Sequence, residues 1–268
     1  MLRSLFTAIS GLQAHQKMLD VTANNIANVN TTAYKSSSAV FEDALSQTLS
    51  GAGSPTATNG GTNPEQIGLG VHLAATNQNF TQGAQQATNI PSNMMINGDG
   101  FFMATKNGQQ VYTRSGAFTL DGAGHLVTPD GAQVEDPTGA PLDLSALNPP
   151  SVYVSYSIDS SGTITGVTNS GGTTNLGQVG LATFANPNGL QKVGDSNYIV
   201  SASSGAAQLS APGTGSAGTI SQGYVEMSNV DLSQELTNLI VAERGFQANS
   251  KVVTTSDEVL QTLVNLKN

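Results

Sequence analysis

Apolar residues with helical spacing occur at both ends of this chain and almost nowhere between them. Near the start they follow alternating steps of three and four residues, interrupted by Gln16, at Leu2, Leu5, Ile9, Leu12, Leu19, Ala23 and Ile26. Near the end a seven-residue repeat with widening neighbours comprises Leu232, Leu236, Leu239, Ile240, Phe246, Val253, Leu260, Leu263 and Val264. Such spacing predicts a long helix at each end.

Neither helix can bury its apolar stripe alone, so the stripes must pair with each other or with neighbouring molecules. A heptad stripe is most often an intramolecular core. Here the position at both termini, apart from a separate middle domain, favours assembly instead. The residues expected at the assembly interface are Leu2, Leu5, Ile9, Leu12, Leu19, Ile26, Leu232, Leu236, Leu239, Phe246, Val253, Leu260 and Leu263.

Between the helices the apolar pattern changes to the period of two that is typical of strands. The predicted strands are residues 98–103, 111–114, 117–120, 125–128, 152–158, 180–184 and 197–201. Hairpin turns are predicted at the dipeptides Asn107-Gly108, Asp121-Gly122, Asp130-Gly131 and Asn188-Gly189. Phe101 and Phe102 are expected on opposite faces of their strand. The predicted class is therefore α+β, with terminal helices paired as a coiled coil and a mainly antiparallel β middle domain.

Polar segments give the boundaries of this organisation. Asn24, Asn25 and Asn28 stop the first helix, and residues 51–64 are rich in Gly, Ser, Thr and Pro, which indicates a connector. Residues 34–49 are compatible with a short helix or an extended arm. Asp231 and Gln234 resemble a capping box at the start of the last helix. The predicted parts are an N-terminal helix (1–30), an extended arm or connector (31–75), a β-rich domain (76–224) and a C-terminal helix (225–268).

Composition excludes several classes of function. The net charge of −9 and scattered Lys and Arg residues argue against a nucleic-acid partner. The 268 residues include no Cys, which excludes disulfides and thiolate sites. No stretch approaches the about 20 apolar residues that span a bilayer, so membrane insertion is not expected. The first ten residues are spaced helically, which predicts no cleaved signal peptide.

Enzymatic sites are not predicted. His15, His72 and His125 are isolated and lack metal-ligand spacing. Residues 213–218 (GTGSAG) match the glycine spacing of dinucleotide sites, but they follow Pro212 in a loop and are interpreted as a chance match. We therefore expect no catalytic, cofactor-binding or metal-binding residues. Gly245 in the last helix either allows a neighbouring helix to approach closely or is a helix-weakening residue that the fold tolerates.

Several segments, in order along the chain, resemble the bacterial flagellar axial proteins, the family of rod, hook and hook-associated subunits. They are residues 23–35 (ANNIANVNTTAYK), 98–102 (GDGFF), 112–118 (YTRSGAF), 124–128 (GHLVT), 222–232 (QGYVEMSNVDL), 244–251 (RGFQANSK) and 254–257 (TTSD). The resemblance marks Asn24, Asn25, Asn28 and Tyr34 as a joint between the inner helix and the arm. Ala33 departs from the Gly that the family usually carries there, so a positive φ at this position would be strained.

The resemblance narrowly favours a short hook-type subunit, with the distal rod protein as the close alternative. Hook-like features are residues 1–5, 60–71, 244–246 and 263–267. The length and residues 222–225 are closer to the rod, and the chain has no room for the extra β domain of typical hook proteins. The hook-like motifs are given more weight than the missing β domain, because a domain can be lost.

The resemblance implies a structural subunit of the flagellar hook or basal body that forms a helical homopolymer. Its expected partners are further copies, neighbouring rod, hook, cap and junction proteins, and the flagellar export apparatus. The packing is expected to be heterologous and open-ended, with termini that fold when neighbours cover them. A monomeric secreted adhesin or binding module and a glycan-cleaving enzyme are the remote alternatives.

Overall fold

A computed structural model describes residues 2–56, 60–145 and 153–266. The chain divides into two compact units. One, here called the helical unit, comprises Met1–Ala27, Ser37–Gln78 and Asp231–Asn268, and the other, the β unit, comprises Asn28–Ser36 and Asn79–Val230. The predicted α+β class with terminal helices is confirmed.

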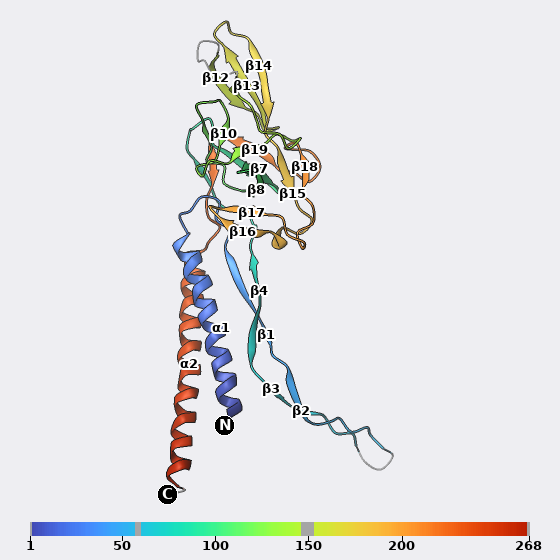
Figure 1. The fold of residues 1–268 in the computed structure, drawn as a ribbon, viewed down its shortest axis with the longest axis vertical. Coiled ribbons are helices and arrows are strands. Elements are labelled where there is room, and N and C mark those ends of the chain that lie inside the picture. Colours follow the sequence, from blue (N-terminus) through green and yellow to red (C-terminus); the bar gives the residue numbers. More distant parts are fainter. Residues whose placement is uncertain (1, 57–59, 146–152, 267–268) are drawn as a thin grey trace. The chain divides into compact units, whose positions relative to one another are not determined.

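The helical unit contains two long helices, α1 (Leu2–Ala27) and α2 (Leu232–Asn265), which lie side by side (Figure 1). Asp231 caps α2, since its carboxylate accepts hydrogen bonds from the backbone N–H groups of Ser233 and Gln234 at 2.9 and 3.3 Å. The predicted capping box is only half present, because the Gln234 side chain donates to Asn238 instead of returning to Asp231. The helix starts later than residue 225 because strand β20 (Tyr224–Glu226) precedes it.

The segment between α1 and the β unit is extended in the helical unit. Strand β1 (Ser37–Asp43) pairs antiparallel with β4 (Val71–Gln78), and β2 (Ser46–Ser50) pairs with β3 (Glu65–Gly68). Of the two alternatives for residues 34–49, the arm is therefore observed. A bridge between Gly53 and Thr62 continues the ribbon into the predicted connector, of which residues 57–59 lie outside the described part.

The β unit is built from antiparallel strands around one nine-stranded sheet. That sheet contains β7 (Phe101–Lys106), β8 (Gln109–Thr113), β9 (Thr119–Leu120), β10 (Leu126–Val127), β11 (Gln133–Val134), β15 (Leu181–Thr183), β16 (Gln191–Gly194), β17 (Asn197–Ile199) and β18 (Gln208–Ser210). Smaller sheets pair β5 (Gln85–Ala87) with β20, β6 (Met94–Asn97) with β19 (Thr219–Gln222), and β12 (Tyr153–Ile158) with β13 (Thr163–Thr168) and β14 (Thr173–Gln178).

Every predicted strand overlaps an observed one, and the hairpin at Asn107-Gly108 is confirmed. Both residues have positive φ, 52° and 78°, and they join β7 directly to β8. The predicted hairpin turn at Asn188-Gly189 is wrong. These residues belong to the short 3₁₀ helix Pro187–Gly189, because Pro187 fixes a helical φ at its start.

Strand β7 separates two buried apolar clusters, as expected from the alternation of Phe101 and Phe102. Phe102 packs against Phe118 with ring centroids 5.0 Å apart. Phe101 lies with Tyr112 and Tyr198 in the second cluster. The edge-to-face geometry of these rings adds a specific attraction to the burial of their apolar surface.

Gly116 allows the chain to pass directly against β6. A Cβ atom at this residue would lie 1.5 Å from the carbonyl oxygen of Met94. We predict that Gly116→Ala destabilises the β unit by about 1–3 kcal/mol, because neither backbone can move without disturbing the core. Denaturant unfolding followed by near-ultraviolet dichroism measures this. Gly122→Ala, whose Cβ would meet nothing within 4 Å, is the control, and equal effects for the two would contradict the assignment.

Candidate functional site

The two terminal helices approach each other through small residues. A Cβ atom on Gly245 would lie 2.3 Å from the His15 ring, and one on Gly11 would lie 2.7 Å from the Asn249 amide nitrogen. Ala8 and Ala242 are buried as well. Gly245 is therefore a point of close helix approach rather than a helix-weakening residue that the fold tolerates.

These contacts fix the direction and register of the pair. Residue 11 faces 249, residue 15 faces 245, and Asn25 donates to Glu235 at 2.9 Å, so the helices are antiparallel. Leu2 would lie level with Glu258 in this register. The last turns of α2 consequently extend past the start of α1 (Figure 1).

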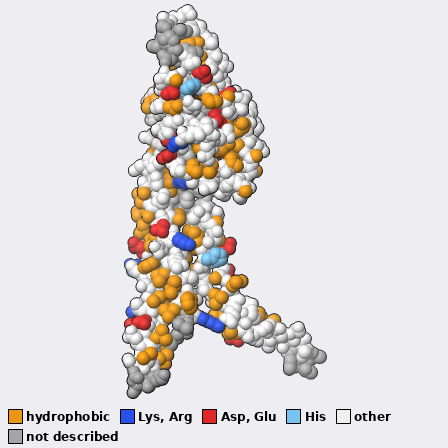
Figure 2. Space-filling model, viewed as in Figure 1, with side chains coloured by type: hydrophobic (Ala, Val, Ile, Leu, Met, Phe, Trp, Pro, Cys, Tyr) orange, Lys and Arg blue, Asp and Glu red, His pale blue; other side chains and the backbone are white. Residues whose placement is uncertain are grey.

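The predicted interface residues are divided between half-buried and exposed positions. Those that are half-buried are Leu5, Leu12, Leu19, Ile26, Leu239, Val253 and Leu260. Those that are exposed are Ile9, Leu232, Leu236, Phe246 and Leu263, while the Leu2 side chain lies outside the described part. Figure 2 shows hydrophobic side chains gathered on the surface over the helices.

Two exposed apolar stripes run along α2. The first stripe, defined here as Leu232, Leu236 and Phe246, and the second stripe, defined as Val241, Val252 and Val259, are each between 39% and 54% exposed. Leu232 and Val241 are nine residues apart, which places them about 180° apart around a helix with 100° per residue. The stripes therefore lie on opposite sides of α2.

The β2–β3 ribbon has an apolar face too. Gln47 pairs with Ile67, and the Leu69 N–H donates to the Leu45 carbonyl, so the side chains of residues 45, 47, 67 and 69 share one face. That face carries Leu45, Ile67 and Leu69, which are between 41% and 85% exposed, while Leu49 lies at the register shift between Thr48 and Ser50. The opposite face carries Ser46, Thr48 and Gln66.

Of the four residues predicted at the joint, Asn25 makes the connecting bonds in the helical unit. Its amide donates to the Ser37 carbonyl at 2.8 Å and accepts from the Ser37 N–H at 3.0 Å, so one side chain pairs with backbone as a strand would. It is 1% exposed. Asn24 is exposed on the same helix.

The other two joint residues lie in the β unit. Thr31 donates from its backbone and its hydroxyl to Asn28. Tyr34 is buried beneath the Lys192 ammonium, which lies 4.1 Å from the ring centroid. Before it, Ala33 is fully buried with φ of 57°, so the expected strained geometry is present.

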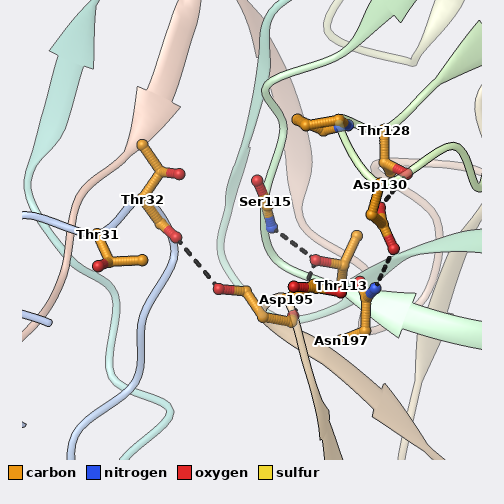
Figure 3. A pocket seen from close by; sticks show the side chains of 10 residues that line it. Thr31, Thr32, Thr113, Ser115, Thr128, Asp130, Asp195 and Asn197 are labelled. Atoms are coloured by element: carbon orange, nitrogen blue, oxygen red, sulfur yellow. Dashed lines mark hydrogen bonds between the residues drawn. The ribbon is translucent and has the colours of Figure 1, made fainter. Parts of the chain in front are cut away.

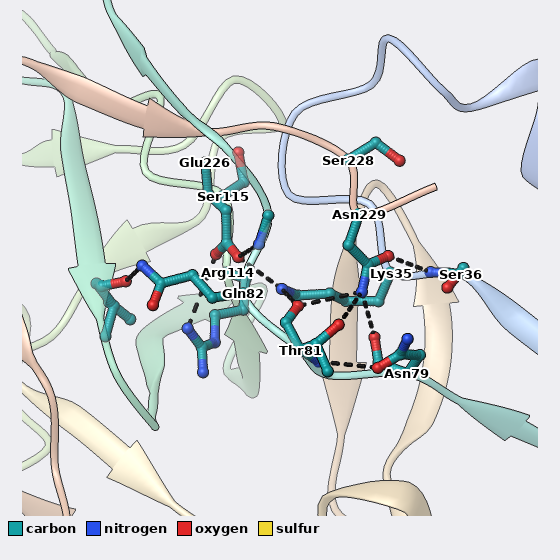
Figure 4. Close-up of polar contacts among 12 residues, drawn as sticks. Lys35, Ser36, Asn79, Thr81, Gln82, Arg114, Ser115, Glu226, Ser228 and Asn229 are labelled. Carbon is teal, nitrogen blue, oxygen red and sulfur yellow. Dashed lines mark hydrogen bonds and ion pairs between the residues drawn. The ribbon is translucent and has the colours of Figure 1, made fainter. Parts of the chain in front are cut away.

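A buried ionic cluster escaped the sequence analysis. Lys35 Nζ lies 2.6 Å from Glu226 Oε1, and Arg114 Nη1 lies 3.7 Å from Glu226 Oε2 (Figure 4). The only available signal was that all three lie within the family-like segments. Asn229 completes the network by accepting from the Ser36 N–H and donating to the carbonyls of Asn79 and Thr81.

A polar cavity of about 330 Å³ lies within the β unit (Figure 3). Its lining includes Thr31, Thr32, Asp130 and Asp195. Burial opposes ionisation of Asp130, but hydrogen bonds from Lys106 and Thr128 hold its pKa below the usual range. Asp130 also accepts from Asn197 at 2.9 Å, so its oxygens are already engaged by the protein.

In the described part of the chain, no group of three or more His, Cys, Asp and Glu residues is placed to hold a metal ion. Neither α1 nor α2 has an apolar stretch that would cross a bilayer.

Comparison with known protein families finds three matches along the chain. Residues 5–35 match the family described as flagella basal body rod protein, and residues 95–166 match the flagellar hook protein FlgE/F/G D1 domain. Residues 221–266 match the flagellar basal body rod FlgEFG protein C-terminal family.

Individual relatives separate the rod from the hook. The flagellar basal-body rod protein FlgG of Bacillus subtilis is 46% identical over 268 residues, which is the whole of both chains. FlgG of Borreliella burgdorferi is 38% identical, over 100% of this chain and 99% of that protein. The flagellar hook protein FlgE of Borreliella burgdorferi is 28% identical, and its alignment spans 442 residues. The preference for a hook-type subunit is therefore not supported, and the rod type is favoured.

We predict that Asn25→Ala loosens the arm from α1, because three hydrogen bonds of a buried amide are lost. The expected cost is about 1–3 kcal/mol. Amide hydrogen exchange of β1 measures it, with Asn24→Ala as the control on the same helix. Similar exchange in both variants would argue against the role of Asn25.

Proposed function

Because the chain belongs to the family of flagellar basal-body rod and hook proteins, we propose that it is a structural subunit of the axial tube of the bacterial flagellum, in the distal rod. The rod position is supported by full-length similarity to FlgG proteins of nearly the same length. In this role the chain transmits torque and encloses the export channel as one of many copies, without catalysis.

The observation that carries this proposal is the unburied apolar surface of α2. Its close approach to α1 uses Gly245 and Ala242, so that the larger side chains of both stripes stay accessible to water. Fully burying one Val, Leu or Phe side chain contributes about 1.5–3 kcal/mol. Covering both stripes therefore supplies a strong driving force for association.

The opposite placement of the stripes favours an open polymer over a closed dimer. A surface that meets its own equivalent closes after two copies, whereas two different surfaces that meet each other continue the chain of contacts. The two stripes lie on opposite sides of one helix and consist of different residues, so they are not equivalent surfaces. We propose that each α2 contacts a different neighbour through each stripe.

The β2–β3 ribbon supplies a further contact. An isolated two-stranded ribbon is marginally stable in water, and this one exposes three large apolar side chains on one face. We propose that the face formed by Leu45, Ile67 and Leu69 lies against a neighbouring copy.

The remaining partners follow from the family. The ends of the tube would contact other rod, hook, cap and junction proteins, and the chain would reach its position through the flagellar export apparatus. The support for both is the resemblance of residues 23–35 and 222–257 to axial proteins together with the family matches at both ends of the chain.

Single charges on the stripes test the assembly surfaces. We predict that Val252→Asp and Leu236→Asp each raise the concentration needed for polymerisation at least about tenfold, because a carboxylate cannot be buried there unpaired. Leu69→Asp tests the ribbon in the same way. Sedimentation velocity and electron microscopy measure the assemblies.

Lys251→Asp is the matched control, because it places a carboxylate on the exposed polar side of the same helix. It should polymerise like the parent chain. Normal polymers from all three stripe and ribbon variants would refute the proposed surfaces.

The position in the flagellum has its own test. Labelled subunits in isolated hook-basal bodies are expected on the rod side of the outer ring, as viewed by immunogold electron microscopy. Label on the hook beyond the ring would contradict the rod assignment while leaving the assembly surfaces untouched.

A further inference from the structure

The β unit buries one carboxylate between two cations. The side chains of Lys35 and Glu226 are 0% exposed and that of Arg114 is 3% exposed. Burial lowers the pKa of Lys35, although the attraction of Glu226 opposes this effect, and it lowers the pKa of Arg114 for the same reason. Lys35 Nζ also donates to the Thr81 carbonyl, and Asp99 and the Phe101 ring also attract Arg114, so Glu226 is a shared partner of the two cations rather than the sole partner of either.

The two cations use Glu226 unequally. Glu226 Oε1 accepts from Lys35 Nζ and from the Gly83 N–H, at 2.6 and 2.8 Å. Glu226 Oε2 accepts no hydrogen bond within the described residues, and Arg114 Nε and Nη1 donate none. These unsatisfied groups face each other at 3.7 Å, so a movement of about 1 Å would make a charge-assisted hydrogen bond.

Lys35 lies on residues 28–36, a segment here called the strap, which follows α1 directly. Besides Lys35, the Ala33 N–H donates to the Glu226 carbonyl and the Ser36 N–H to Asn229. The Tyr34 ring, with Lys192 4.1 Å from its centroid, adds to this hold, whereas backbone strain at Ala33 opposes it. Ala33 is in the left-handed region at φ of 57°, and Thr31 and Thr32 border the polar cavity (Figure 3).

We propose that the strap has a released state in which Lys35 leaves Glu226 and Arg114 moves closer to the carboxylate, so that Glu226 keeps a cation beside it. Removing Lys35 alone would leave a buried charge uncompensated, which is strongly unfavourable. Arg114 prevents this because it already lies beside the unused carboxylate oxygen. In this released state the strap detaches locally while the core of the β unit stays folded.

Amide hydrogen exchange tests the released state, measured on the full-length chain at a concentration too low for polymerisation. Lys35→Met should speed exchange of strap amides at least about tenfold and leave those of β7 and β8 unchanged. The Arg114 Nε–H resonance should also move to the position of a guanidinium bound to a carboxylate. Arg114→Met should slow strap exchange, because the released state has lost its stabilising partner. A merely structural Arg114 would give faster exchange.

The double variant Lys35→Met/Arg114→Met completes a double-mutant cycle. It should lose protection in β7 and β8 by more than the two single variants combined, because Glu226 then has neither partner. Additive effects, an unmoved Arg114 resonance in Lys35→Met, or global unfolding of Lys35→Met would each overturn the proposal.

Discussion

The close, small-residue contact between α1 and α2 is the constraint on which the account of this protein depends. Where Gly11 and Gly245 meet their partners, the helix backbones approach too closely for large side chains to fill the seam. The residues that are buried in the seam are small, such as Ala8 and Ala242. Larger apolar side chains of α2, such as Leu236, Phe246 and Val252, stay exposed beside it.

A second constraint holds the segments that connect the two units. Lys35, Asn79, Glu226 and Asn229 lie next to places where the chain passes from one unit to the other. Their hydrogen bonds bring segments together that are as many as 193 residues apart in sequence. The Lys35–Glu226 bond is buried and charge-assisted, while the Asn229 bonds are part-buried or exposed, so directional polar contacts join these segments.

Sequence reasoning identified the features that depend on local chemistry. Asp231 caps a helix, and Asn107-Gly108 turns a hairpin, because each needs only its immediate neighbours. Strand β14 was not predicted from the sequence, because residues 173–178 (TTNLGQ) carry one apolar side chain and are held by pairing with β13.

The candidate site was only partly predictable. Heptad spacing identifies an apolar face, but it does not tell which partner covers that face, and of the two glycines in the seam the sequence pointed to Gly245 but not to Gly11. The Lys35–Glu226 pair is set by tertiary folding. The preference for the hook failed because rod and hook proteins share the terminal motifs, so the length of the chain was the more informative feature.

The absence of Cys from the sequence allows the most direct test of the central claim. Single Cys residues at Leu236 and Val252 would report, through their rate of alkylation, whether each α2 stripe is accessible. We expect rapid labelling of both positions in dilute full-length chain and protection of both in assembled tubes, with a Cys at Lys251 as reference. Protection at every dilution, or unchanged labelling after assembly, would contradict it.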